Sequence, residues 1–326
     1  MIPGIIAGAT WALETVILGI ALAMSPFCTT EQAIFLAPFV STFLHDLFSA
    51  IFATIYNGVQ GKLKNVWKAF CTKSGKFVVL AAAIGGPIGM TGYVMCVNYM
   101  GASVGAIASA IFPAIGAVLA YFFLKEKMKW YQWAFLAVTL GGVIGLSYTP
   151  EMAENANYLL GILGALMCSF GWGIEAVILA KSLTDPEVTD EYALQIRQTT
   201  SALVYGILLL PILGCIKGGI FSGWSFAASL FVNTEAVWLI PVIAIAALFA
   251  TVSYLFYYKA IAQIGASKAM ALNITYTAWA MLFAVVLSVF QGAVQLPSLL
   301  SVGCAVVVLV CGILAAADFK ELLKKN

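Results

Sequence analysis

Apolar side chains dominate ten long runs of the chain, separated by short stretches in which lysines, acids, glycines and prolines gather. Each run is close to the roughly 20 residues that an α-helix needs to cross about 30 Å of hydrocarbon. Lipid offers no partner to an unpaired backbone group, and the runs are too long for barrel strands, so we expect helices. The runs cover residues 2–24, 33–56, 75–97, 103–124, 129–148, 158–181, 193–215, 237–262, 267–290 and 297–316. The pattern predicts an all-α membrane protein with ten transmembrane helices.

The second half of the chain repeats features of the first half when the sequence is shifted by 161 residues. Three matches carry the repeat: Trp11-Ala-Leu-Glu14 falls on Trp172-Gly-Ile-Glu175, Tyr93 falls on Tyr254, and, after a slip of three residues, Gly101-Ala-Ser103 falls on Gly265-Ala-Ser267. An odd number of helices in each half places the halves in opposite orientations, with the substrate near the midplane between them. We therefore expect two inverted five-helix repeats, in residues 1–150 and 151–326.

Proline and glycine interrupt two of the predicted helices. The segment Gly85-Gly-Pro87-Ile-Gly89 lies in the third run, and Pro113 lies in the fourth. Proline removes a backbone donor and clashes with the preceding turn, so each proline can kink or break its helix. A proline tolerated within a packed bundle is the equally compatible alternative.

The composition narrows the possible classes of protein. Of the 326 residues, 63% are hydrophobic and 9% are charged, whereas soluble domains carry roughly a quarter charged residues. No polar stretch of the sequence is long enough to form a soluble domain. We therefore expect the chain to be surrounded by a lipid bilayer and to have neither a nucleic-acid partner nor an obligate protein partner. The seven cysteines lack CxxC spacing, which predicts no disulfide, metal site or cofactor. The first run has no preceding basic residue and no small-residue cleavage pattern, so we expect a membrane helix there and not a signal peptide.

Basic residues indicate the orientation of the chain. On one side lie Lys62, Lys64, Lys68, Lys73 and Lys76 after the second run, Lys125, Lys127 and Lys129 after the fourth, Lys181 at the end of the sixth, Lys259 and Lys268 around the turn after the eighth, and Lys320, Lys324 and Lys325 in the tail. The loops on the other side hold essentially only Lys217. Because short cytoplasmic loops carry the excess of Lys and Arg, both termini are expected to be cytoplasmic.

Four ionisable residues lie well away from the ends of the predicted spans, at bilayer depth, where each costs a few kcal/mol and by default faces the protein interior. They are Glu14, His45, Asp46 and Glu175. Glu14 follows Trp11 by three residues, as Glu175 follows Trp172, so in each helix the indole and the carboxylate share a face. Membrane tryptophans usually form an interfacial belt, but belt residues lie at span ends, and these two lie near the centres.

Aromatic rings beside a carboxylate suit an organic cation that has no donor hydrogens. A quaternary ammonium is attracted to the negative ring faces by roughly 0.5 to 2 kcal/mol per ring. Further rings at compatible depth are Tyr93, Tyr254, Tyr257, Tyr258, Tyr276 and Trp279. For any single tyrosine, core packing with a bonded hydroxyl is the commoner role. The candidate substrate site consists of Trp11, Glu14, Tyr93, Trp172, Glu175, Tyr254, Tyr258, Tyr276 and Trp279.

The same carboxylates are candidates for proton coupling. Burial favours the protonated form of a carboxylate and a bound cation favours the charged form, so proton and substrate can compete for or share one site. Glu14 and Glu175 could instead make structural hydrogen bonds. His45 could relay a proton at physiological pH or pack as a neutral residue. Asp46 points about 100° away from His45 on an ideal helix, so we expect it to pair with Arg197.

The chain resembles the drug/metabolite transporter superfamily with paired EamA repeats, and within it the LicB-type choline permeases. The resembling segments are Gly85-Gly-Pro-Ile-Gly-Met90, Ser109-Ala-Ile-Phe-Pro-Ala-Ile115, Phe122-Phe-Leu-Lys125, Trp172-Gly-Ile-Glu175, Ile196-Arg-Gln198, Ser253-Tyr-Leu-Phe-Tyr-Tyr258 and Lys268-Ala-Met-Ala-Leu-Asn273 with Tyr276 and Trp279. They run in order along nearly the whole chain. The resemblance implies proton-coupled choline uptake across a bacterial cytoplasmic membrane through an aromatic pocket, with Trp11, His45, Trp172, Glu175 and Tyr254 at matching positions. Glu14 departs from the family pattern and leaves the number of protons open.

Cation import has three alternatives. An EamA-type exporter of amino acids, metabolites or drugs shares the scaffold, but an amino-acid carrier should offer a cationic partner to the substrate carboxylate, whereas this interior is expected to be acidic and aromatic. An intramembrane enzyme would need a catalytic cluster, and a single histidine with no paired motif predicts none. A receptor or assembly subunit would carry longer loops. Betaine, which has a carboxylate, should be repelled by Glu14 and Glu175.

Overall fold

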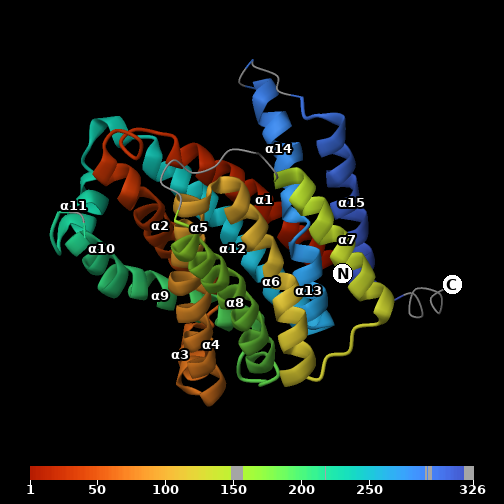
Figure 1. The fold of residues 1–326 in the computed structure, drawn as a ribbon. Helices are drawn as coiled ribbons and strands as arrows, with labels where there is room; N and C mark the ends of the chain where they lie inside the picture. Colours follow the sequence, from red (N-terminus) through yellow and green to blue (C-terminus); the bar gives the residue numbers. More distant parts are fainter. Residues whose placement is uncertain (148–156, 217, 291, 293–295, 319–326) are drawn as a thin grey trace.

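The computed structural model describes residues 1–147, 157–216, 218–290, 292 and 296–318, and all regular structure within them is helical (Figure 1). The helices are α1 (Ile2–Leu22), α2 (Glu31–Val59), α3 (Leu63–Cys71), α4 (Lys73–Ala83), η1 (Ile84–Ile88), α5 (Gly89–Met100), α6 (Ala102–Phe123), α7 (Trp130–Ser147), α8 (Tyr158–Ser182), α9 (Asp190–Val204), η2 (Tyr205–Leu209), α10 (Leu210–Ile216), α11 (Ser222–Ser229), η3 (Thr234–Ala236), α12 (Leu239–Ile264), α13 (Ala266–Asn273), α14 (Tyr276–Phe290) and α15 (Leu299–Ala316). The predicted all-α class is confirmed.

Long apolar helices account for the expected spans. In the described part of the chain, nine helical stretches are long and apolar enough to cross a membrane, and they coincide with nine of the ten predicted runs. The remaining run corresponds to α7, which has 18 residues. Its first four residues, Trp130-Tyr-Gln-Trp133, all carry a polar group in the side chain and lower its mean hydropathy. The helices are therefore consistent with ten spans, with α7 as the least apolar of them.

The two prolines differ in their effect. Pro87 lies in η1, a π-helical turn that joins α4 to α5 within one span, and such turns are rare and often mark functional positions. The predicted interruption is therefore confirmed at Pro87. Pro113 lies inside α6, which runs without a break from Ala102 to Phe123, so the tolerated-proline alternative holds there.

The two glycines that the repeat aligns have the same backbone conformation. Gly101 has φ 93° and ψ 160°, and Gly265 has φ 86° and ψ 164°. Each ends one long helix and begins the next, at α5–α6 and at α12–α13. Positive φ with extended ψ is a region that glycine alone enters readily. The shared conformation explains why a glycine stands at both positions.

Helix pairing also follows the repeat. α1 packs along α12, and α8, its counterpart in the second half, packs along α5. The pairs α2 with α9 and α7 with α15 join helices in equivalent places of the two halves. Two related halves would produce this pattern. The boundary between residues 150 and 151 lies outside the described residues, so the division into two repeats stays a prediction.

The lysine-bearing turns lie at one end of the bundle. Figure 1 shows α3, the end of α6 with the loop after it, and the end of α8 at the same end. There Lys62 bonds Glu191 at 2.6 Å and ties the α2–α3 turn to α9. Lys217, Lys320, Lys324 and Lys325 lie outside the described residues. The cytoplasmic location of this lysine end stays a prediction.

Two of the apolar clusters of the described residues contain or contact the candidate residues. Tyr254 belongs to one cluster, with Trp11 and Trp172 packed against it. Tyr93 and Met90 pack against the other, which is built around the first half of α2 and η2. The helices that carry the predicted site therefore pack against both of these apolar clusters.

Candidate functional site

Two cavities in the middle of the bundle share three aromatic residues. Trp11, Trp172 and Tyr276 line both of them. We name the cavities by their carboxylates, the Glu175 cavity and the Glu14 cavity. The three shared rings come from α1, α8 and α14, so rings that are distant in sequence form one layer between the two spaces.

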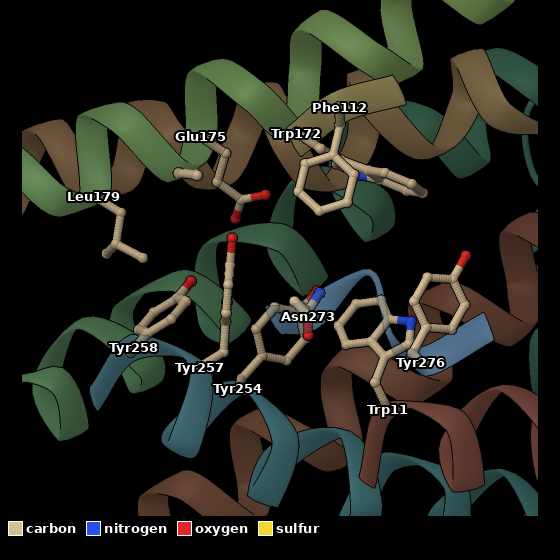
Figure 2. Close-up of a pocket in the computed structure, with 11 residues that line it drawn as sticks. Trp11, Phe112, Trp172, Glu175, Leu179, Tyr254, Tyr257, Tyr258, Asn273 and Tyr276 are labelled. Atoms are coloured by element: carbon tan, nitrogen blue, oxygen red, sulfur yellow. The ribbon is translucent and has the colours of Figure 1, made fainter. Parts of the chain in front are cut away.

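The Glu175 cavity is small and largely aromatic. Its volume is about 60 Å³, enough for a few waters. Its lining residues are Trp11, Phe112, Trp172, Glu175, Ala176, Leu179, Tyr254, Tyr257, Tyr258, Asn273 and Tyr276. Leu179 lies one turn from the end of α8, so the cavity extends towards the lysine end. Figure 2 shows the Tyr257 hydroxyl turned towards Glu175, with Trp11 and Tyr276 farther along the cavity.

Three polar atoms at the Glu175 cavity are buried without a hydrogen-bond partner among the described residues. They are the hydroxyls of Tyr257 and Tyr258 and the Oδ1 atom of Asn273. An unsatisfied buried polar group costs about 1 to 3 kcal/mol. A cluster of three at one cavity therefore indicates a place for a polar group that is supplied from outside the chain.

The Glu14 cavity is larger and opens towards the opposite end of the bundle. Its volume is about 270 Å³, close to the lower end of the range for small-molecule sites. It reaches Leu22, the last residue of α1, and Pro38, in the first third of α2. Tyr93 and Ser109 line it together with Glu14. Since this side is opposite the lysine end, the predicted orientation makes it the outer side.

Ring contacts bring the predicted aromatic residues together. Trp11 meets Tyr254 with ring centroids 5.1 Å apart and Tyr276 at 6.4 Å, both edge to face. Trp172 stacks on Tyr93 at 6.2 Å. Trp279 is the exception, because its ring turns along its own helix, stacks on Phe283 at 6.4 Å and lines neither cavity. The other predicted rings, Tyr254 and Tyr258 included, line one cavity or both.

The ionisable residues inside the spans form one connected network. His45 places Nε2 3.4 Å from Oε1 of Glu14 and Nδ1 3.0 Å from Oδ1 of Asp46. The expectation that Asp46 points away from His45 is wrong, because both side chains bend along the helix to meet. Ser201 donates its hydroxyl to Oδ2 of Asp46 at 2.5 Å. His45 therefore bridges two carboxylates, and the packing-only interpretation does not describe it.

Arg197 completes the network. Its Nε donates to Oε1 of Glu175 at 2.9 Å, and its Nη1 lies 3.5 Å from Oδ2 of Asp46, which confirms the predicted Asp46–Arg197 pair. The guanidinium also lies over the Tyr254 ring, 4.6 Å from its centroid. Glu175 is therefore already paired with a cation within the protein, which sequence reasoning missed.

The net charge of the network is negative. Counted as ionised, Glu14, Asp46 and Glu175 with the Arg197 guanidinium give −2 when His45 is neutral and −1 when it is protonated. Arg197 is buried among these acids at 3% exposure, so the acidic interior also holds one cation among the described residues. None of the described residues that line the two cavities is a lysine or an arginine. An additional buried cation would be electrostatically favoured.

The glycine-rich turn η1 packs directly against Trp172 and Glu175. Trp172 donates its indole N–H to the Gly85 carbonyl oxygen at 2.9 Å. A Cβ atom at Gly85 would overlap the Glu175 carboxylate, and one at Gly89 would lie 2.9 Å from the Trp172 indole. The absence of a side chain at these two positions allows α8 to bring Trp172 and Glu175 against the turn.

Two residues of the Glu175 cavity, Phe112 and Asn273, are not among the candidate site residues predicted from the sequence. Phe112 packs edge to face on Trp172 at 5.9 Å, but it sits in an apolar run where phenylalanine is ordinary. Asn273 ends α13, just before the Ile274–Thr275 break that separates α13 from α14. A polar amide inside an apolar run was the only available indication.

Parts of the chain are similar to known transporters and to a LicB protein. Residues 1–148 match the EamA-like transporter family. This match covers just under half of the chain. The LicB protein of Haemophilus influenzae is 30% identical over 203 residues, an alignment that covers 62% of this chain and 63% of that relative. The chain is therefore similar to EamA-like transporters over residues 1–148 and to a LicB protein over somewhat less than two thirds of that relative's length.

A solved crystal structure has the same fold along nearly the whole chain. It superposes with a TM-score of 0.60 and covers 98% of this chain and 98% of its own, at 17% identity. At that identity the likeness concerns the fold alone. It supports a continuous architecture beyond residue 148.

Proposed function

We propose that this transporter imports choline or a related quaternary ammonium compound together with protons, by alternating access. The observation that carries the proposal is the combination of an aromatic layer with a buried network of net negative charge. Trp11, Trp172 and Tyr276 line both cavities, and Glu14 and Glu175 each line one. Ring faces and carboxylates together suit a cation that cannot donate hydrogen bonds.

The unpaired polar atoms support a substrate that carries a hydroxyl group. Choline has a trimethylammonium head and a hydroxyl tail. The head suits the rings, and the tail can donate to Oδ1 of Asn273 or exchange hydrogen bonds with the Tyr257 and Tyr258 hydroxyls, which have no partner among the described residues. Betaine has a carboxylate in place of the hydroxyl and would meet Glu175 with like charge.

The two cavities suit alternating access. The Glu14 cavity has about 270 Å³ and the Glu175 cavity about 60 Å³, so the first is open while the second is contracted. With cytoplasmic termini and the lysine end inside a bacterial cytoplasmic membrane, substrate enters beside Glu14 and leaves beside Glu175. Movement of two inverted repeats, residues 1–150 and 151–326, would exchange the open side. The shared rings would contact the substrate throughout.

Proton coupling is assigned to Glu14, His45, Asp46 and Glu175. His45 touches both Glu14 and Asp46, so an imidazole connects a carboxylate at the open cavity to one in the buried core. Histidine exchanges protons near neutral pH. A negative interior adds about 2.3 kcal/mol per charge per 100 mV to cation entry, which makes import the favourable direction.

The rival function is EamA-type export of amino acids, metabolites or drugs. An amino-acid substrate needs a cation for its carboxylate, and Arg197 is committed to Glu175 and Asp46. The absence of lysine and arginine among the described lining residues of both cavities therefore supports import of a cation over export of an amino acid.

Uptake into proteoliposomes tests the proposal. Radiolabelled choline is supplied outside with an inward proton gradient, for the wild type, Trp172→Ala and Glu175→Gln. We expect saturable uptake that a protonophore lowers, and a much higher half-saturating choline concentration in both variants because each binds choline more weakly. A wild type that neither binds nor transports choline would overturn the proposal and would direct the search to amino acids and other organic cations in both directions.

A further inference from the structure

The Arg197 guanidinium occupies the position that a substrate cation would need. Its Nε bonds Glu175 at 2.9 Å, and its Cζ lies 4.6 Å from the Tyr254 ring centroid. A carboxylate and a tyrosine face are the two features that the Glu175 cavity offers an ammonium group. Arg197 is 3% exposed, so these contacts are made in the protein interior.

A second set of contacts can hold Arg197 when Glu175 is taken by another cation. Nη1 donates to Oε1 of Gln198 at 2.7 Å and lies 3.5 Å from Oδ2 of Asp46. Gln198 is fixed in turn by its donation to Ser49 at 2.7 Å. The guanidinium can therefore release Glu175 while it keeps Asp46 and Gln198. The charged and titratable groups around it are Glu175, Asp46, Tyr254 and Tyr258.

We propose that Arg197 is the internal counter-cation of the empty carrier: it pairs with Glu175 when no substrate is bound and yields Glu175 to the substrate ammonium. This inference rests on the proposed import of a quaternary ammonium. An unpaired carboxylate is costly to bury, so a carrier without Arg197 would be held back whenever it had to reorient empty. With substrate bound, the ammonium neutralises Glu175 and Arg197 is dispensable for reorientation.

Net uptake and exchange separate these two steps. Net uptake requires the empty carrier to return, whereas exchange of outside for inside choline requires only the loaded carrier to move. We expect Arg197→Gln to lower net uptake relative to exchange by at least about tenfold, because a buried charge is left uncompensated. We also expect it to bind choline several-fold more tightly, because a competing cation has been removed from Glu175. A merely structural role would lower binding, exchange and net uptake together.

Two further variants control for folding. Arg197→Lys keeps the charge and should keep a ratio of net uptake to exchange near that of the wild type. Arg197→Gln combined with Glu175→Gln removes both members of the pair, leaves Asp46 with His45 and Ser201, and should restore the ratio although choline binds more weakly. If Arg197→Gln gives no folded protein, the ratio of net uptake to exchange in the double variant tests the inference.

The measurements use purified full-length protein in proteoliposomes, with choline binding followed by tryptophan fluorescence. A parallel loss of exchange and net uptake in folded Arg197→Gln, weaker choline binding in that variant, or a low ratio in the double variant would overturn the inference. A wild type with no choline binding or transport would instead overturn the proposed function. The two failures are therefore distinguishable.

Discussion

The indole nitrogen of Trp172 lies 2.9 Å from the carbonyl oxygen of Gly85, and the missing side chain of that glycine leaves room for the Glu175 carboxylate. The π-helical turn thus fixes the ring and the acid of α8 together. Both candidate substrate contacts of this helix depend on one position in another span, 87 residues away in the sequence.

Gly85→Ala should therefore damage the site by overpacking. A Cβ atom there would overlap the Glu175 carboxylate, and overpacked cores lose about 1 to 3 kcal/mol. We expect a lower melting temperature and loss of choline binding. Gly141→Ala is the matched control, because a Cβ atom at Gly141 meets nothing within 4 Å. Equal behaviour of the two variants would contradict the close contact.

Trp11→Ala should weaken choline binding by about tenfold, since one ring contributes roughly 0.5 to 2 kcal/mol to binding a cation. Trp11 lines both cavities and contacts Tyr254 and Tyr276. Trp279→Ala removes an indole of the same size that lines neither cavity and should leave affinity nearly unchanged. Titration by calorimetry in detergent checks both. A similar loss in both variants would indicate general destabilisation and not a ring contact with the substrate.

Asn273→Ala should distinguish choline from tetramethylammonium, which has no hydroxyl group. The Asn273 Oδ1 atom is buried at the Glu175 cavity without a partner among the described residues, so a substrate hydroxyl can donate to it. A hydrogen bond of about 1 kcal/mol corresponds to a fivefold loss of choline affinity. Affinity for tetramethylammonium should change little. Competition against radiolabelled choline measures both, and equal losses would remove Asn273 from recognition of the hydroxyl.

Glu14→Gln should uncouple uptake from the proton gradient. The variant keeps the size of the side chain but cannot ionise, and Glu14 is the carboxylate that reaches both the open cavity and His45. We expect choline uptake that a pH gradient no longer stimulates, while uptake driven by the choline gradient persists. Glu31→Gln, at the exposed start of α2, is the control. If a pH gradient still stimulates choline uptake by Glu14→Gln, proton coupling would belong to Asp46 and Glu175 and not to Glu14.

Much of the site could be predicted from the sequence because polar and ionisable residues are rare inside apolar membrane helices. Trp11 and Glu14, like Trp172 and Glu175, share a face by helical spacing, and each pair does line a cavity. The Asp46–Arg197 pair could be predicted because few charges exist inside the spans to pair with. The fold class followed from run length and composition alone.

The remaining features depend on rotamers and on contacts between helices. The direction of the Trp279 ring along its own helix is a choice of χ angles that spacing does not determine. The contact of Arg197 with Glu175 joins α9 to α8, and nothing in either segment specifies it. His45 and Asp46 meet because both side chains bend, which an ideal helical wheel does not represent.

Arg197 also stands in the path between the two cavities. Glu14, His45, Asp46, Arg197 and Glu175 form a continuous chain of charged groups from one cavity to the other. A guanidinium does not give up its proton in proteins. A proton that arrives at Glu14 can therefore travel along this chain to Asp46 and no farther while the carrier is at rest. Arg197 therefore closes this route to protons between transport cycles, so that a proton entering beside Glu14 would not reach Glu175 along it.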